Sequence, residues 1–215
     1  MLNNSPSYFM SGIITLLISF TIHEFAHAWT ATMFGDDTPR LYGRLTLNPI
    51  AHLDILGSLM LIFAGFGWAK PVPINPRKLQ QHSPAALMFV ALSGPLSNFL
   101  LAVLAAIPLR FGWVTPTAPM VDIFPTPYQF LLYFLFTNLV LMVFNLIPLP
   151  PLDGEAILEF ILPPAWEEQW EAIKPYGPYI LLGLFILGPM IGFNLLDVLI
   201  SPLVMRMVNL LLGGF

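Results

Sequence analysis

The chain is a series of long apolar stretches joined by short polar connections. Four of them are long enough, at about 20 residues each, to cross a hydrocarbon core about 30 Å thick as helices. They comprise residues 8–34, 85–109, 128–146 and 179–212. The last block is interrupted by Gly188, Pro189, Ser201 and Pro202. Because glycine and proline weaken helices, this block is expected to hold either one spanning helix with an interfacial one, or two crossings.

A fifth apolar stretch, residues 55–68, is too short to span a bilayer comfortably. We predict that it forms a re-entrant or interfacial element. In that case five cations share one face of the membrane: Arg40, Arg44, Lys70, Arg77 and Lys78. The positive-inside rule makes this face cytosolic, and the first helix then runs from outside to inside. If the short stretch crosses instead, the last three cations move to the outer face.

Composition supports a membrane protein. Hydrophobic residues make up 57% of the chain and charged residues 9%, which is too apolar for a soluble domain. We predict an all-α integral membrane protein, a polytopic helix bundle of about four to six transmembrane segments with a short re-entrant or strand-containing element. The expected organisation is one membrane-embedded domain over residues 1–215, with a catalytic core over about 8–160 and C-terminal helices over about 178–212.

Charge and cysteine content exclude several classes of function. The net charge is −4 and no basic run occurs, which argues against a nucleic-acid partner. The chain has no cysteine, so disulfides, thiolate metal sites and cysteine nucleophiles are excluded.

Residues 67–79 carry Pro71, Pro73 and Pro76 and cannot form a regular helix. This stretch is predicted to be either an ordinary loop or an extended edge that pairs with a substrate peptide by strand addition.

The candidate chemistry lies in the first apolar stretch, which contains His23, Glu24 and His27. Two histidines four residues apart lie on one face of a helix, about one turn apart, and both can reach a single ion. The H-E-x-x-H pattern predicts two imidazole ligands for Zn²⁺, with the glutamate as general base. Ionisable groups are costly within a membrane helix and therefore indicate function. A polar interhelical network without metal is the alternative.

A catalytic zinc usually takes three protein ligands, so a third ligand must come from another segment. The candidates are Asp36, Asp37, His52, Asp54, His82, Asp122, Asp153 and Asp197. Asp153 is favoured because it follows the 128–146 helix within a proline-rich turn, at the membrane depth expected for His27. Its negative charge also lowers the cost of holding Zn²⁺ in a medium of low dielectric constant.

Together these residues and three further motifs resemble the site-2 protease family of intramembrane zinc metalloproteases. The motifs are HEFAH at 23–27, NPIAHLDILGS at 48–58, SGPLSN at 93–98 and NLIPLPPLDG at 145–154, in the order found in the family. The region after Asp153 carries no matching motif. No soluble block interrupts the chain, so the regulatory PDZ domain of many members is missing.

The resemblance implies His23, His27 and Asp153 as zinc ligands and Glu24 as the catalytic acid and base. It also implies Asn145 as a group that steadies the oxyanion or the ligand aspartate. Four further residues are predicted to lie around the ligands or to contact substrate: His52, Asp54, Asn75 and Asn98. His52 and Asp54 are only two residues apart, so on a helix they would not face one ion.

The predicted function is zinc-dependent hydrolysis of a peptide bond in the transmembrane segment of a membrane-protein substrate, that is, regulated intramembrane proteolysis. The expected partners are that substrate helix and the lipid bilayer. The expected location is the plasma membrane, with the active site nearer its cytosolic side. Two alternatives remain at this point. One is a metal transporter, which would not need Glu24 as a base, and the other is a non-catalytic membrane scaffold.

Overall fold

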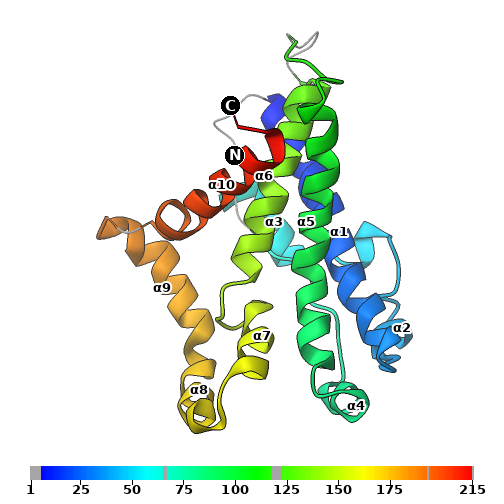
Figure 1. Ribbon diagram of the computed structural model, residues 1–215, viewed down its shortest axis with the longest axis vertical. Coiled ribbons are helices and arrows are strands. Elements are labelled where there is room, and N and C mark those ends of the chain that lie inside the picture. Colours follow the sequence, from blue (N-terminus) through cyan, green and yellow to red (C-terminus); the bar gives the residue numbers. More distant parts are fainter. Residues whose placement is uncertain (1–5, 65–66, 118–122, 193, 215) are drawn as a thin grey trace.

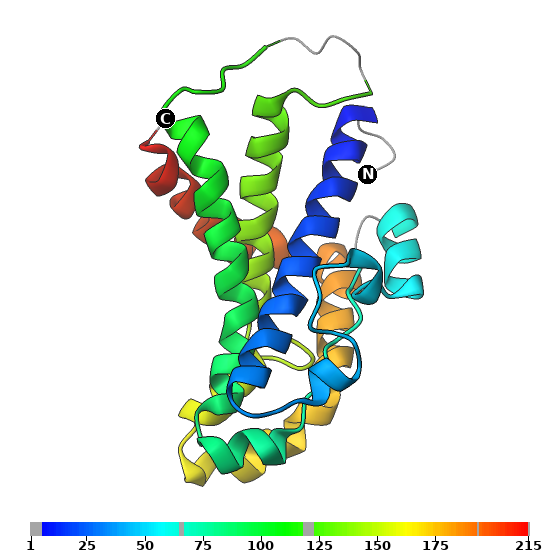
Figure 2. The ribbon, with the colours of Figure 1, turned by 90° about the vertical axis from the view of Figure 1, so that its right-hand side faces the viewer.

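The structure is a computed structural model of the 215-residue chain, and it describes residues 6–64, 67–117, 123–192 and 194–214. In the described residues the regular structure is helical throughout, apart from one isolated β-bridge. Three long helices, α1 (Pro6–Met33), α5 (Ala86–Arg110) and α6 (Pro127–Asn145), run side by side along the long axis of the molecule (Figures 1 and 2). The predicted fold class, an all-helical membrane bundle, is confirmed.

The remaining elements are short and surround the ends and sides of these three helices. They are α2 (Thr38–Leu41), η1 (Pro49–Ala51), α3 (Ile55–Ala64), α4 (Pro76–His82), α7 (Gly154–Ile161), η2 (Pro164–Trp166), α8 (Glu167–Ile173), η3 (Lys174–Tyr176), α9 (Gly177–Met190), the π-helical turn η4 (Leu196–Ile200) and α10 (Ser201–Leu212).

The three long helices correspond to the first three predicted spans. Among the described residues, they are the helices long and apolar enough to cross a membrane. Helix α5 packs between α1 and α6. Its small residues Ala102, Ala105 and Ala106 are almost fully buried against Leu135 and Leu139 of α6. Small side chains allow helix axes to approach closely, which is how helices associate where lipid supplies no hydrophobic driving force.

The fourth predicted stretch is not one continuous helix. Helix α9 has 14 residues and α10 has 12, with the turn η4 before Ser201 and Pro202. Helix α9 stands to the left of the long helices in Figure 1, and α10 packs obliquely against α5 and α6. The C-terminal carbonyls of α10, Leu210 O and Leu211 O, accept hydrogen bonds from the Arg110 guanidinium at 3.1 and 3.0 Å. How often this block crosses the membrane stays a prediction.

The short stretch after residue 54 turns back on itself. It forms the ten-residue helix α3, and Leu53 before the helix forms an antiparallel bridge with Ala69 after it. The Lys70 amide also donates to His52 O at 2.8 Å. Because the two ends of the stretch meet, the structure agrees with the predicted re-entrant element. The membrane sidedness inferred from the neighbouring cations stays a prediction.

A buried carboxylate fixes the connection between α1 and α4. Asp36 is fully buried, and its Oδ1 accepts hydrogen bonds from the Thr38 amide at 3.1 Å and hydroxyl at 2.5 Å. Its Oδ2 accepts from the Asn75 amide at 2.6 Å. Burial acts to raise the pKa of Asp36, but these donors outweigh it, so the pKa lies below its ordinary value of 3.8.

Asp36→Asn should therefore destabilise the protein by about 1–3 kcal/mol, because an amide directs N–H groups at donors that require an acceptor. A lowered pKa in the folded state means that Asp36 stabilises the fold above its unfolded-state pKa. That contribution is lost as the pH falls below about 4. Thermal unfolding in detergent at pH 7 and at pH 3.5 tests this, and a stability difference that does not shrink at the lower pH would contradict it.

Candidate metal centre

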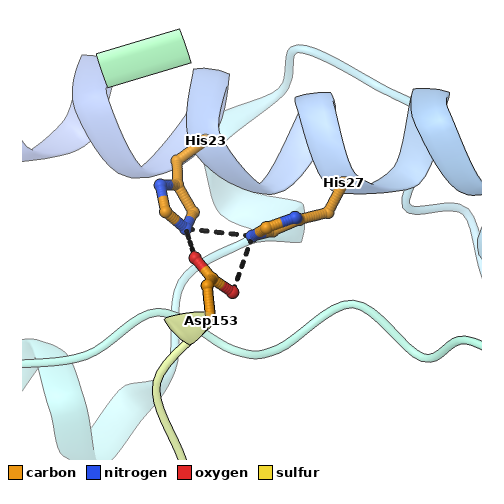
Figure 3. Close-up of side chains that lie close together, drawn as sticks. All are labelled: His23, His27 and Asp153. Atoms are coloured by element: carbon orange, nitrogen blue, oxygen red, sulfur yellow. Dashed lines mark hydrogen bonds and ion pairs between the residues drawn. The ribbon is translucent and has the colours of Figure 1, made fainter. Parts of the chain in front are cut away.

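Three side chains from two distant segments meet on one side of α1. His23 and His27 lie one turn apart on α1, and Asp153 lies directly before α7. Asp153 faces both imidazoles (Figure 3), with its Oδ2 3.2 Å from His23 Nε2 and its Oδ1 3.3 Å from His27 Nε2. The two Nε2 atoms are 3.0 Å apart. The structure thus brings together the three residues predicted to bind the metal.

The hydrogen bonds of the two Nδ1 atoms determine which imidazole nitrogens are free to bind a cation. His27 Nδ1 lies 2.7 Å from Val90 O, and His23 Nδ1 lies 2.6 Å from Asn98 Oδ1. Carbonyl oxygens only accept hydrogen bonds, so both Nδ1 atoms must carry the proton and donate. In the neutral form of each ring, the lone pair of Nε2 then faces the other ring and Asp153. This is the tautomer that a metal-ligating histidine needs, held by the usual outer partners.

The cluster has the chemistry of a zinc site. Two imidazole lone pairs and a carboxylate converge, and their ligand atoms all lie within 4.8 Å of one another. Asp153 Oδ2 is buried without a hydrogen-bond partner in the described structure. Three acceptors this close suit a shared cation, and two histidines with one carboxylate are a ligand set typical of Zn²⁺.

Gly94 on α5 makes room for the two imidazoles. A Cβ atom at this position would lie less than 3.0 Å from ring atoms of both His23 and His27. The sequence motif at residues 93–98 therefore has a steric role here: the lack of a side chain at Gly94 lets α5 pack against the two imidazoles.

Gly94→Ala should displace the imidazoles and lower zinc affinity, with an overpacking cost of about 1–3 kcal/mol. The matched control is Gly183→Ala in α9, where a Cβ would meet nothing within 4 Å. Zinc titration and thermal unfolding of both variants in detergent measure the effect. Equal zinc affinity for Gly94→Ala and wild type would show that the rings move without cost.

Glu24 lies beside the cluster and not in it. It is buried and lines the same cavity as the two histidines. Its Oε2 is 3.9 Å from Nη2 of Arg44, a buried guanidinium that also donates to Lys70 O. Arg44 thus connects the glutamate with the wall of the cavity.

The cavity has a volume of about 430 Å³ and is walled mainly by apolar side chains. Residues from α1, α5, α6, the turn before α7 and the proline-containing stretch 67–74 contribute to it. Asn145 reaches this cavity from the end of α6, where its Nδ2 donates to Leu141 O at 2.9 Å. This bond uses one of its two N–H groups, so the second N–H can donate to a partner in the cavity.

The other predicted site residues have different surroundings. Asn98 is fully buried and contacts His23. His52 is buried with its Nε2 2.8 Å from Thr46 O, and Asp54 Oδ1 accepts from the Gly57 amide at 2.8 Å at the start of α3. Asn75 caps α4, since its Oδ1 accepts from the Lys78 amide at 3.3 Å. The structure does not bring these last three to the cluster, and a role in substrate contact stays a prediction.

Of the eight candidates for a third ligand, Asp153 is the one that joins the two histidines within the described part of the chain. Asp122 lies outside the described residues. Sequence reasoning missed Val90 and Arg44 as neighbours of the cluster, and Asn138, whose Oδ1 accepts from Asn98 Nδ2 at 2.9 Å. Val90 acts through its backbone carbonyl, which carries no sequence signal, whereas Asn138 is an isolated amide in an apolar stretch and could have been found by the cost of burying it.

Comparisons with known proteins agree with this site. The family described as "Peptidase family M50" matches this chain over residues 11–126. A Bacillus subtilis protein named "Putative zinc metalloprotease YwhC" is 43% identical over 81% of this chain and 79% of its own length. Two proteins named "Putative zinc metalloprotease Rip2" are 36% and 34% identical. The Mycolicibacterium smegmatis one aligns over 83% of this chain and 67% of its own length, and the Mycobacterium tuberculosis one over 86% and 70%.

No solved structure gives a significant match. The family and the relatives' names favour an enzyme over the transporter and scaffold alternatives. A zinc cofactor accords with the names and with the histidine and aspartate cluster. The chain therefore belongs to Peptidase family M50, the site-2 protease family, and is a membrane zinc metalloprotease.

Proposed function

We propose that the protein hydrolyses a peptide bond within the transmembrane segment of a membrane-protein substrate, and that His23, His27 and Asp153 hold the zinc. The depth of the cluster carries this proposal. His23 lies ten residues before Met33, the end of α1, which corresponds to a rise of about 15 Å along the helix. A hydrocarbon core is about 30 Å thick, so a peptide bond at this level belongs to a membrane-embedded segment.

The residues divide the proposed reaction between them. Zinc held by this cluster supplies a Lewis acid and lowers the pKa of a coordinated water. Glu24, in the same cavity, takes the proton from the attacking water and passes it to the leaving amine. The Asn145 amide, which lines the cavity, either stabilises the oxyanion that develops on the substrate or orients Asp153. Arg44 compensates the buried charge of Glu24.

The extended stretch beside the cavity suits an unwound substrate. Val72 lines the cavity between Pro71 and Pro73, and no protein partner for its backbone groups occurs in the described structure. Lys70 and Asn75, on either side, are fixed through their backbone to His52 and Asp36. A substrate strand can therefore pair with the free edge. Because a helical peptide bond is already hydrogen-bonded, substrates with glycine, proline or asparagine near the cut should be preferred.

We also propose that the protein resides in the plasma membrane with the site nearer the cytosolic side. The end of α1 that lies closer to the histidines leads into the segment with Arg40 and Arg44, and Lys70, Arg77 and Lys78 follow the turned-back element. Positive residues in short loops mark the cytosolic face.

Cleavage of model single-pass substrates by the purified, zinc-loaded protein in detergent tests this function. One substrate carries a glycine and proline pair in the middle of its transmembrane segment, and the matched one carries leucines there. We expect zinc-dependent cleavage inside the segment of the first and far slower cleavage of the second. Cleavage confined to soluble loops of both substrates would contradict an intramembrane substrate while leaving a metalloprotease.

A further inference from the structure

Two asparagines are buried where the proposed reaction does not require them. Asn98, in the middle of α5, and Asn138, in the middle of α6, are both fully buried. Amide side chains are costly in the interior of spanning helices unless their hydrogen bonds are made. The position of Asn138 is unusual because it contacts neither a predicted metal ligand nor the cavity.

The hydrogen bonds of these asparagines form a directed relay between two helices and His23. Asn138 Nδ2 donates to Phe134 O at 2.9 Å, so its Oδ1 faces Asn98. Asn98 Nδ2 donates to that oxygen at 2.9 Å, so its own Oδ1 faces His23 Nδ1 at 2.6 Å. The relay ends on a backbone carbonyl, which only accepts. Because Phe134 O can only accept, it determines the orientation of the Asn138 amide, then that of the Asn98 amide, and finally the position of the proton on His23 Nδ1.

We propose that Asn138 is a positioning residue for the metal centre: through Asn98 it fixes the tautomer and ring orientation of His23, so that Nε2 is free to bind Zn²⁺. The inference rests on the proposed role of His23 as a zinc ligand. It extends the support of the ligands to the middle of α6, a helix that contributes none of the three proposed ligands.

The two histidines are supported differently. His27 Nδ1 donates directly to Val90 O, a backbone group that no side-chain substitution removes. His23 depends on two side chains, and an amide in place of a carboxylate can bind in either of two orientations. Without Asn138, Asn98 is free to rotate its amide and present Nδ2 to His23. This rotation would drive the ring proton to Nε2, where it blocks the metal.

The test measures Zn²⁺ affinity of the full chain in detergent by chelator competition. Asn138→Leu should lower the affinity about 10-fold and Asn98→Leu by up to about 100-fold, the range known for outer partners of metal-bound histidines. Ser97→Ala is the control, since Ser97 adjoins Asn98 but its hydroxyl donates to Gly94 O within its own helix at 2.7 Å. This control should keep the native affinity.

Substitutions of Asn138 in a second variant, Asn98→Asp, distinguish a positioning role of Asn138 from a role in helix packing. In Asn98→Asp a carboxylate accepts from His23 Nδ1 through either oxygen, so the tautomer no longer depends on Asn138. Adding Asn138→Leu to this background should cause no further loss of zinc affinity. Asn138→Ser, whose side chain is too short to bridge to Asn98, should behave like Asn138→Leu in both backgrounds and replaces it if the leucine variant does not fold.

Native affinity in Asn138→Leu, or an equal loss in both backgrounds, would overturn the relay. His23→Ala distinguishes this failure from failure of the proposed metal site. If His23→Ala lowers zinc affinity and the Asn138 variants do not, the relay is wrong and the site stands. If His23→Ala also leaves zinc affinity unchanged, both are wrong. Proteolysis is not measured, so the outcome does not depend on finding a substrate.

Discussion

Glu24→Gln is expected to lower the rate of peptide-bond hydrolysis by about 10²–10⁴-fold, the usual contribution of a general acid and base. Glutamine keeps the size of the side chain but cannot take a proton from water. Glu24 is not among the three converging ligands, so the zinc content of the variant should equal that of wild type. Initial cleavage rates, with zinc measured by mass spectrometry on the same samples, test both parts.

A second glutamate in the same cavity provides the control for Glu24. Glu155 on α7 also lines the cavity, but its Oε1 forms an ion pair with Lys174 Nζ at 3.0 Å. Burial acts to lower the pKa of Lys174, but hydrogen bonds and charge from Glu159 and Glu155 raise it to about 12, so Lys174 carries its charge at neutral pH. Glu155→Gln should therefore retain most of the activity. A larger loss for Glu155→Gln than for Glu24→Gln would transfer the acid–base role to Glu155.

The sequence was sufficient for the spanning helices because their signal is local. Length and apolar composition alone mark α1, α5 and α6, and the helix period places His23 and His27 on one side of α1. The number of helices in the C-terminal block, residues 179–212, was harder to predict. Its composition is as apolar as the others, but whether a glycine and proline pair ends a helix or only bends it depends on packing, and here the chain separates into α9, η4 and α10.

The proposed metal ligands could be predicted from local sequence, whereas most of the residues that contact them or Glu24 could not. Asp153 could be singled out because a proline-rich turn and the helix before it limit where the carboxylate can lie. The partners of the ring nitrogens could not, because they depend on the relative rotation of α1, α5 and α6 about their axes. Val90 acts through a carbonyl that every residue type possesses, and Arg44 reaches Glu24 from a separate loop.

Asp153→Ala is expected to lower zinc affinity by more than about 100-fold, beyond the 10–100-fold cost of losing an outer partner. The substitution removes a proposed ligand atom and the only negative charge among the three converging side chains. A metal that binds the folded state stabilises it by mass action, so excess Zn²⁺ should raise the Tm of wild type but not of Asp153→Ala. Zinc titration by chelator competition and thermal unfolding in detergent give the two readouts.

The matched control for this prediction is Asp197→Ala. Asp197 was also a candidate third ligand, but it lies exposed on η4, away from the cluster. Its removal should leave zinc affinity and the zinc-dependent rise in Tm at wild-type values. Asp153→Asn adds an intermediate step, because the amide keeps one oxygen ligand without the charge, and its affinity should fall between the two. If Asp153→Ala binds zinc as tightly as wild type, the third ligand is not Asp153, and the proximity of its carboxylate to the two imidazoles has another cause.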